Sequence, residues 1–117
     1  MAKPEKIVTL SLASRDGTTA RTLAAFRGEA QGARVSFASV ELLWKVLTPR
    51  RWAILRAMAG QGGLSIREIA RRVGRDVKAV HGDVDALIEA GLLDRDSAGL
   101  VALPFDAVRV DFTLAAA

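Results

Sequence analysis

The sequence has 117 residues, of which 50% are hydrophobic, with no cysteine and a net charge of +4. A chain of this length is expected to form one domain with a buried core. The lack of cysteine excludes disulfides, thiolate metal sites and a cysteine nucleophile. There is no signal-peptide pattern and no apolar run approaching about 18 residues, so we expect a cytoplasmic protein without a membrane partner.

Positive charge is concentrated in one part of the chain. Residues 1–47 carry a net charge of +3, residues 48–75 carry seven arginines and one glutamate for a net +6, and residues 76–117 carry a net −5. The basic block would attract the phosphate backbone of a nucleic acid duplex. A solvated, arginine-rich helix face is the alternative explanation.

The N-terminal third predicts a strand, a helix and a short strand. Apolar and polar residues alternate over 6–14, which is typical of a half-buried strand. An alanine-rich helix is expected over about 18–30, and it would need a partner surface to be stable. A second strand is expected over 34–37. We therefore expect residues 1–38 to form a strand-helix extension that serves as a dimerisation element.

Two helix-start signals follow. Ser39 is expected to cap a helix over 40–47. Thr48 followed by Pro49 is expected to begin a helix over 49–59, because proline is favoured at the first helical position.

The stretch over 65–93 predicts a helix-turn-helix motif. Ser65 and Glu68 have the spacing of a capping box, in which Ser65 accepts from the Glu68 amide and the Glu68 side chain reaches back. Gly74 is expected to end this short helix, and Asp76 to cap the next one. Two helices joined by a short turn that contains glycine form a helix-turn-helix.

The second helix of the motif has one apolar stripe, which should face the core. The stripe consists of Val77, Val80, Val84, Leu87 and Ile88.

A hairpin and a final strand are predicted after the motif. Residues 92–95 and 100–103 flank a turn-rich tip, and such a hairpin directly after the second helix is the wing of a winged helix. Four apolar residues alternate with polar ones over 108–114, which predicts a strand with one apolar face. The expected fold class is α+β, with the extension at 1–38 and a winged helix-turn-helix DNA-binding domain, including the C-terminal strand, at 39–117.

Three segments carry a family resemblance: LTPRRWAILRAM, LSIREIARRVGRDVKAVHGDVDALIEAGLLDRD and LPFDAVRVDFTL. Over about residues 35–114 the chain resembles small MarR-like winged-helix transcriptional regulators of prokaryotes, of the kind encoded beside TumE-type toxins. The resemblance implies DNA binding and repression of the protein's own operon. It also implies an antitoxin role, with a cognate toxin as a protein partner.

Four residues of the second helix are predicted to contact bases in the major groove, because they lie opposite the apolar stripe. Lys78 can donate to guanine, Ala79 can meet a thymine methyl group, His81 can donate or accept at a base edge, and Gly82 lets the backbone come close. The alternative for His81 is a solvent-facing or capping histidine.

The predicted phosphate contacts are the cations around the motif and the capped start of its first helix. They are Arg50, Arg51, Ser65, Arg67, Arg71, Arg72 and Arg75. Arg95 in the wing would reach the minor groove, although two neighbouring aspartates argue against a strongly basic wing. Asp83 and Asp85 are expected to pair with arginines on neighbouring elements rather than to read bases.

Catalysis is not expected. The chain has one histidine, no cysteine and no tyrosine, and it shows no nucleophile–base arrangement, no phosphate-binding glycine loop and no metal-ligand spacing. No cofactor is therefore predicted. The alternative to a DNA-binding protein is a winged helix whose main partner is another protein.

We also expect a homodimer, because specific DNA sites usually need two half-sites. The strands over 6–14 and 108–114 have apolar faces and few local partners, and a second copy would cover them. The alternative is that they extend the wing sheet within one chain.

Overall fold

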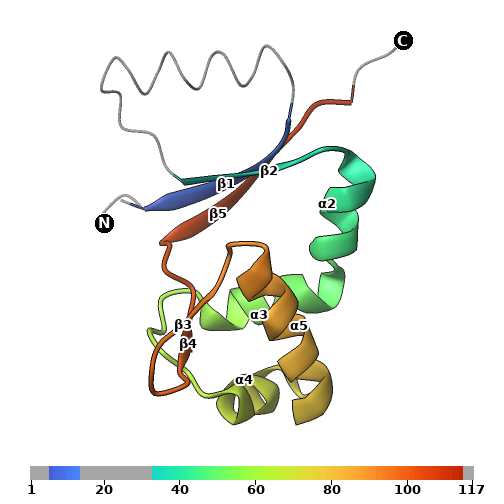
Figure 1. The fold of residues 1–117 in the computed structure, drawn as a ribbon. Coiled ribbons are helices and arrows are strands. Elements are labelled where there is room, and N and C mark those ends of the chain that lie inside the picture. The colour runs from blue at the N-terminus through green and yellow to red at the C-terminus, as the bar shows by residue number, and fades with distance from the viewer. Residues whose placement is uncertain (1–5, 14–32, 115–117) are drawn as a thin grey trace.

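A computed structural model describes residues 6–13 and 33–114 (Figure 1). Its elements, in chain order, are β1 (Ile7–Leu12), β2 (Ala33–Phe37), α2 (Val40–Val46), α3 (Pro49–Met58), α4 (Ile66–Val73), α5 (Val77–Glu89), β3 (Asp94–Arg95), β4 (Val101–Ala102) and β5 (Ala107–Asp111). The helix predicted over 18–30 lies outside the described residues. In the described part, no helix is long and apolar enough to span a bilayer.

Each of the four helices among the described residues begins at the polar residue that the sequence indicates. The hydroxyl groups of Ser39, Thr48 and Ser65 each accept a hydrogen bond from the amide three residues later, at 3.1 to 3.2 Å. The Asp76 carboxylate accepts from two amides of the first turn of α5. Gly74 ends α4 in the left-handed conformation, with φ of 68°. These contacts satisfy amide groups that a helix start leaves without an internal partner.

The helix-turn-helix formed by α4 and α5 packs on α3 through fully buried side chains. Val80, Val84 and Leu87 of α5 have no exposed surface, as predicted from the stripe. Ile54 of α3 and Ile69 of α4 are also fully buried and belong to the same core. The spacing of the apolar residues thus predicts correctly which side of α5 faces inward.

Val77 is the exception to the predicted stripe, because 44% of its surface is exposed. It lies in the first turn of α5, at the end of the molecule farthest from β1, β2 and β5 (Figure 1). Val77 therefore has the helical position of the stripe, but the core that buries Val80, Val84 and Leu87 leaves it exposed.

The wing is a short antiparallel hairpin of β3 and β4, in which Arg95 is opposite Val101. The backbone of Leu64, just before α4, exchanges two hydrogen bonds of 2.8 Å with Val101. The wing is therefore attached to both ends of the motif. The order of α3, α4, α5 and hairpin confirms the predicted winged helix.

The remaining strands form a second, parallel sheet in the order β2-β1-β5. Leu10 of β1 lies between Val35 of β2 and Val110 of β5 in the register. The prediction that the N- and C-terminal strands have few partners within the chain is therefore wrong, and so is the alternative that they extend the wing sheet. The apolar faces of β1 and β5 can share one layer over the winged helix, and α2 connects this sheet to α3 (Figure 1).

The C-terminal strand is shorter than predicted. It ends at Asp111, and Phe112 and Leu114 beyond it are 36% and 96% exposed. Phe112 contacts Trp44 of α2 edge-to-face, with ring centroids 5.7 Å apart. The alternating pattern therefore continues past Asp111, the last residue of β5 that pairs with β1.

Candidate nucleic-acid interface

The four predicted base-contact residues lie together on the exposed side of α5. Lys78, Ala79, His81 and Gly82 are all exposed, and α4 and the start of α5 form one end of the molecule (Figure 1). A Cβ atom added at Gly82 would meet nothing within 4 Å. The packing of the chain itself therefore does not require a glycine there, and this side of the helix is open to an external partner.

Asp83 of α5 is the centre of a partly buried ion-pair cluster. Its carboxylate lies 3.0 Å from Arg51 Nε and 2.8 Å from Arg75 Nη1, and the exposed fractions of the three side chains are 17%, 21% and 20%. Arg51 also donates to the carbonyl oxygens of Lys45 and Val46 at the end of α2. The cluster joins α2, α3, the turn before α5 and α5 itself. Arg51 and Arg75 thus have structural partners, and a phosphate contact from either stays a prediction.

The Asp83 carboxylate is held ionised by its two arginines. Partial burial alone would raise its pKa, but the hydrogen bonds and charges of Arg51 and Arg75 outweigh burial and lower the pKa below the ordinary 3.8. A carboxylate with a lowered pKa stabilises the fold above its ordinary pKa, and this stabilisation disappears as the pH falls through the lowered value.

Asp83→Asn is therefore expected to lower the free energy of unfolding at pH 7 by about 1–3 kcal/mol, because two partly buried arginines lose their counter-charge. Urea denaturation at pH 7 and at successively lower pH would measure it, and the difference from the wild type should shrink below about pH 3.8. Asp85→Asn is the matched control on the same helix. Its carboxylate is 49% exposed, so the change should be within about 0.5 kcal/mol. Equal effects of the two substitutions would contradict a special role for Asp83.

Glu68 of α4 binds two of the predicted phosphate-contact arginines. Its carboxylate accepts from Arg71 Nε at 2.8 Å and from Arg72 Nε at 2.7 Å, and Arg72 also donates to Gln61. Hydrogen bonds from Arg71 and then Arg72 lower the pKa of Glu68 to about 2. The Glu68 side chain therefore does not reach back to Ser65, and only the Ser65 half of the predicted capping box forms. The competing arginines lie on the same face of the helix, three and four residues further on.

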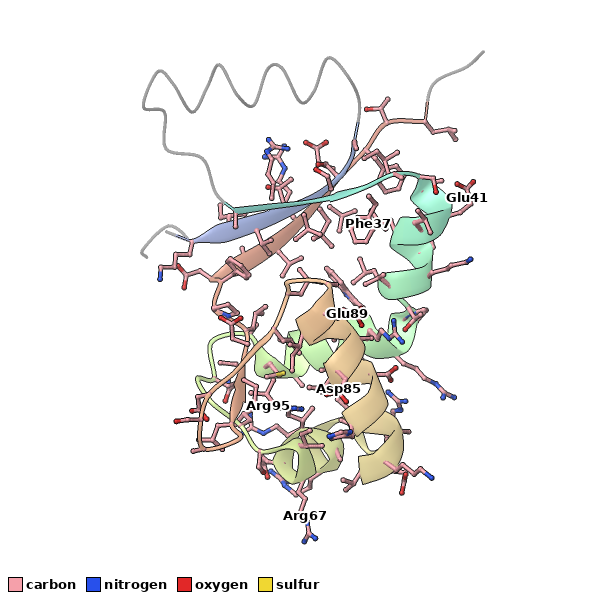
Figure 2. The ribbon with its side chains drawn as sticks, in the orientation of Figure 1. Phe37, Glu41, Arg67, Asp85, Glu89 and Arg95 are labelled. Atoms are coloured by element: carbon pink, nitrogen blue, oxygen red, sulfur yellow. The ribbon has the colours of Figure 1, made fainter. Side chains whose placement is uncertain are left out.

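Asp85 connects α5 to the wing, as the expectation of an arginine partner on a neighbouring element predicts. One carboxylate oxygen lies 3.0 Å from Arg95 Nη2 and the other 3.3 Å from His81 Nδ1. Figure 2 shows Arg95 reaching from the hairpin toward Asp85. The same acidic group therefore holds a predicted base contact and the predicted wing contact. The sequence predicts an arginine partner for Asp85 but does not identify it as Arg95, because ten residues separate the two.

Three cations of the predicted interface remain without an ion-pair partner among the described residues. They are Arg50, Arg67 and Lys78, and all three are exposed. Arg67 extends away from the body of the molecule at the α4 end (Figure 2). Arg67 and Lys78 therefore place free positive charge at the end formed by α4 and the start of α5, whereas Arg50 lies in the first turn of α3. No group of His, Asp or Glu side chains in the described part could hold a metal ion.

More than half of the sequence matches the profile of one protein family. The profile of the HVO_A0114 family matches residues 46–110. The chain belongs to the HVO_A0114 family. The matched segment contains α3, the helix-turn-helix, the wing and β5 up to Val110. It therefore includes all the predicted DNA-contact residues.

Two solved structures are similar to this chain over 77% of its length. One is the PcaV transcriptional regulator from Streptomyces coelicolor in complex with its natural ligand, with 29% identity and a TM-score of 0.45. The other is a protein of unknown function from Listeria innocua Clip11262, with 19% identity and a TM-score of 0.46. The similar region covers 62% of the PcaV chain and 67% of the Listeria chain. No curated protein matches the sequence.

Proposed function

We propose that this protein is a sequence-specific regulator that binds double-stranded DNA with α5 in the major groove and represses its own operon. The observation that carries the proposal is the open face of α5, with Lys78, Ala79, His81 and Gly82 exposed at one end of the molecule. This face adjoins free cations and is followed by a hairpin. A winged helix-turn-helix presents its second helix to DNA in this way. Repression of its own operon rests on the resemblance to MarR-like regulators.

Base recognition in this proposal uses the first two turns of α5. Lys78 has no competing acidic partner among the described residues, so its ammonium group is free to donate to guanine O6 and N7. The exposed Ala79 and Val77 side chains can meet thymine methyl groups. Gly82 leaves room for the DNA to approach the helix backbone.

Phosphate contacts in this proposal come from two kinds of arginine. Arg50 and Arg67 are free, whereas Arg71 and Arg72 share the single charge of Glu68. Because the Arg71 side chain is 70% exposed, it can reach a phosphate without disrupting any packed side chains. The capped start of α4 at Ser65 adds amide groups that favour an anion.

Two copies of the chain would bind together on one operator. A single winged helix has a small footprint, and a two-fold dimer would present two recognition helices about 34 Å apart, or roughly 10 base pairs. We therefore expect the operator to be an inverted repeat with this spacing.

A different observation favours a second candidate function, binding to a protein. Acidic groups lie among the cations of the candidate interface: Glu68, Asp76 and Asp85 are on α4, at the α5 cap and on α5. A mixed-charge face suits a protein partner, and the family resemblance names a cognate toxin as that partner. Binding to duplex DNA that is abolished by salt would favour the DNA-binding function. A chain without such salt-dependent binding to duplex DNA would favour the protein partner.

Lys78→Ala should weaken binding to the specific site by about 1–3 kcal/mol and relax the sequence preference, because one base contact is lost. Fluorescence anisotropy with the chain's own upstream DNA and with a random duplex would measure both effects. Arg67→Ala is the matched control, since this free arginine should reduce the affinity for both duplexes equally. If Lys78→Ala binds its operator as tightly as the wild type, the proposed orientation of α5 is contradicted.

A further inference from the structure

Strand β5 is an edge of the parallel sheet. It pairs with β1 on one side, and no strand among residues 6–13 and 33–114 pairs with its other side. The Ala107 amide donates to the Lys6 carbonyl, at 3.3 Å, so Ala107 directs its backbone groups toward β1. Successive residues of a strand direct these groups to opposite edges. Val108 and Val110 therefore present their N–H and C=O groups on the free edge.

The sequence of this edge strand is complementary to itself. Val108, Val110 and Phe112 alternate with Arg109 and Asp111, whose side chains are 68% and 51% exposed. In an antiparallel pair of identical strands centred on Val110, the residue numbers of opposite positions add to 220. Arg109 is then opposite Asp111 of the second copy, and Val108 is opposite Phe112 of the second copy. Opposite charges in directly facing positions stabilise a strand pair.

Other registers lack this complementarity. A pair centred on Arg109 places two arginines face to face, and one centred on Asp111 places two aspartates face to face, which is unfavourable. Centring on Val108 or Phe112 places no oppositely charged residue of the second copy beside Arg109 or Asp111, which then have only each other, 3.8 Å apart in one chain. In the register centred on Val110, the two copies of Val110 face each other as a hydrogen-bonded pair. The outward N–H and C=O groups of Val108 and Val110 then all bond to the second copy.

The face of the parallel sheet that is directed toward α2 and α3 has room, beside β5, for apolar side chains from a second strand. A hollow of about 420 Å³ is lined by Trp44, Leu47, Thr48, Pro49, Trp52 and Val110. A second hollow of about 170 Å³ lies further along β5, where Trp52 and Val108 contribute to its walls. A strand that continues the sheet past β5 would direct its own apolar residues to this face.

We propose that β5 forms the homodimer interface by pairing antiparallel with β5 of a second copy, centred on Val110. The inference rests on the proposed function only in its purpose, which is to present two recognition helices to one duplex. The two-fold axis is perpendicular to the continuous six-stranded sheet. Because the winged helix of each chain lies on one face of the sheet (Figure 1), both winged helices then lie on the same side.

Cysteine cross-linking of the full chain tests the register. The chain has no cysteine, so Val110→Cys can form a disulfide only between copies. Facing residues of a hydrogen-bonded pair have Cα atoms about 5.5 Å apart, which a disulfide can bridge. Val108→Cys is the matched control, because the two copies of residue 108 would be about 13 Å apart. Mild oxidation should cross-link Val110→Cys into a covalent dimer and leave Val108→Cys monomeric on a non-reducing gel.

Charge exchange tests the same pairing without a cysteine. Arg109→Asp should raise the dimer dissociation constant by about tenfold, because two pairs of like charges then face each other across the axis. Arg109→Asp combined with Asp111→Arg should restore it. Light scattering or analytical ultracentrifugation would measure the constant.

Three results would overturn the proposal: a wild-type chain that is monomeric at tens of micromolar, equal cross-linking of Val108→Cys and Val110→Cys, or no restoration by the double substitution. These are distinct from failure of DNA binding. A monomer that binds its operator would remove the β5 dimer and leave the proposed function intact. A β5-paired dimer that binds no duplex would do the reverse.

Discussion

The affinity of this protein for duplex DNA is expected to fall steeply with salt. If each subunit contacts about three to five phosphates, log affinity against log salt concentration should have a slope of roughly −3 to −5 per subunit. Between 50 and 200 mM salt this corresponds to a loss of roughly 60- to 1000-fold. The structure identifies Arg50 and Arg67 as free, and Arg71 and Arg72 as sharing one counter-charge.

The slope can be assigned to particular residues by titrating variants over the same salt range. Arg67→Ala should reduce it by about one per subunit, because one phosphate contact is lost. Arg56→Ala is the control, since this exposed arginine lies on α3 outside the predicted contacts. A flat response of the wild type to salt would contradict the assignment of the α4 end as a DNA surface.

Leu87→Ala is expected to lower the free energy of unfolding by about 2–5 kcal/mol. Leu87 has no exposed surface and lies on α5 in the core that joins α5 to α3 and α4. Truncation removes buried methyl groups and leaves a cavity among side chains that can relax only in part. Denaturant unfolding followed by circular dichroism would measure the loss, and DNA affinity should fall with the folded fraction.

Val77→Ala is the matched control on the same helix and the same predicted stripe. Its side chain is 44% exposed, so the change in stability should be within about 0.5–1 kcal/mol. The sequence pattern predicts that both residues lie in the core, whereas the structure buries only Leu87. The two stability losses therefore distinguish the structure from the pattern. A loss at Val77 as large as that at Leu87 would contradict the exposed position of the first turn of α5.

The sequence alone determined the helix starts and the inward face of α5. Ser39, Thr48, Ser65 and Asp76 each cap a helix through amides two or three residues away. Such contacts depend only on neighbouring residues, so spacing is sufficient to predict them. The same applies to the left-handed Gly74 and to the four exposed base-contact candidates, whose side of the helix follows from the buried stripe.

The partners of the charged groups were decided by the tertiary structure. Arg51 and Asp83 are 32 residues apart in sequence, and the packing of α3 against α5 brings them to 3.0 Å. The sequence shows an excess of arginines but not which of them lack a partner. Two of the seven predicted phosphate-contact residues are consequently held by Asp83, and the free charge concentrates at Arg50, Arg67 and Lys78.

The parallel sheet also depends on tertiary structure. Alternation of apolar residues predicts that β1 and β5 are strands with one apolar face, because that pattern is local. It does not say which strand lies beside which, since β1 and β5 are about a hundred residues apart in the sequence. That meeting decides that Val108 and Val110 lie on an edge, with their outward backbone groups directed away from β1.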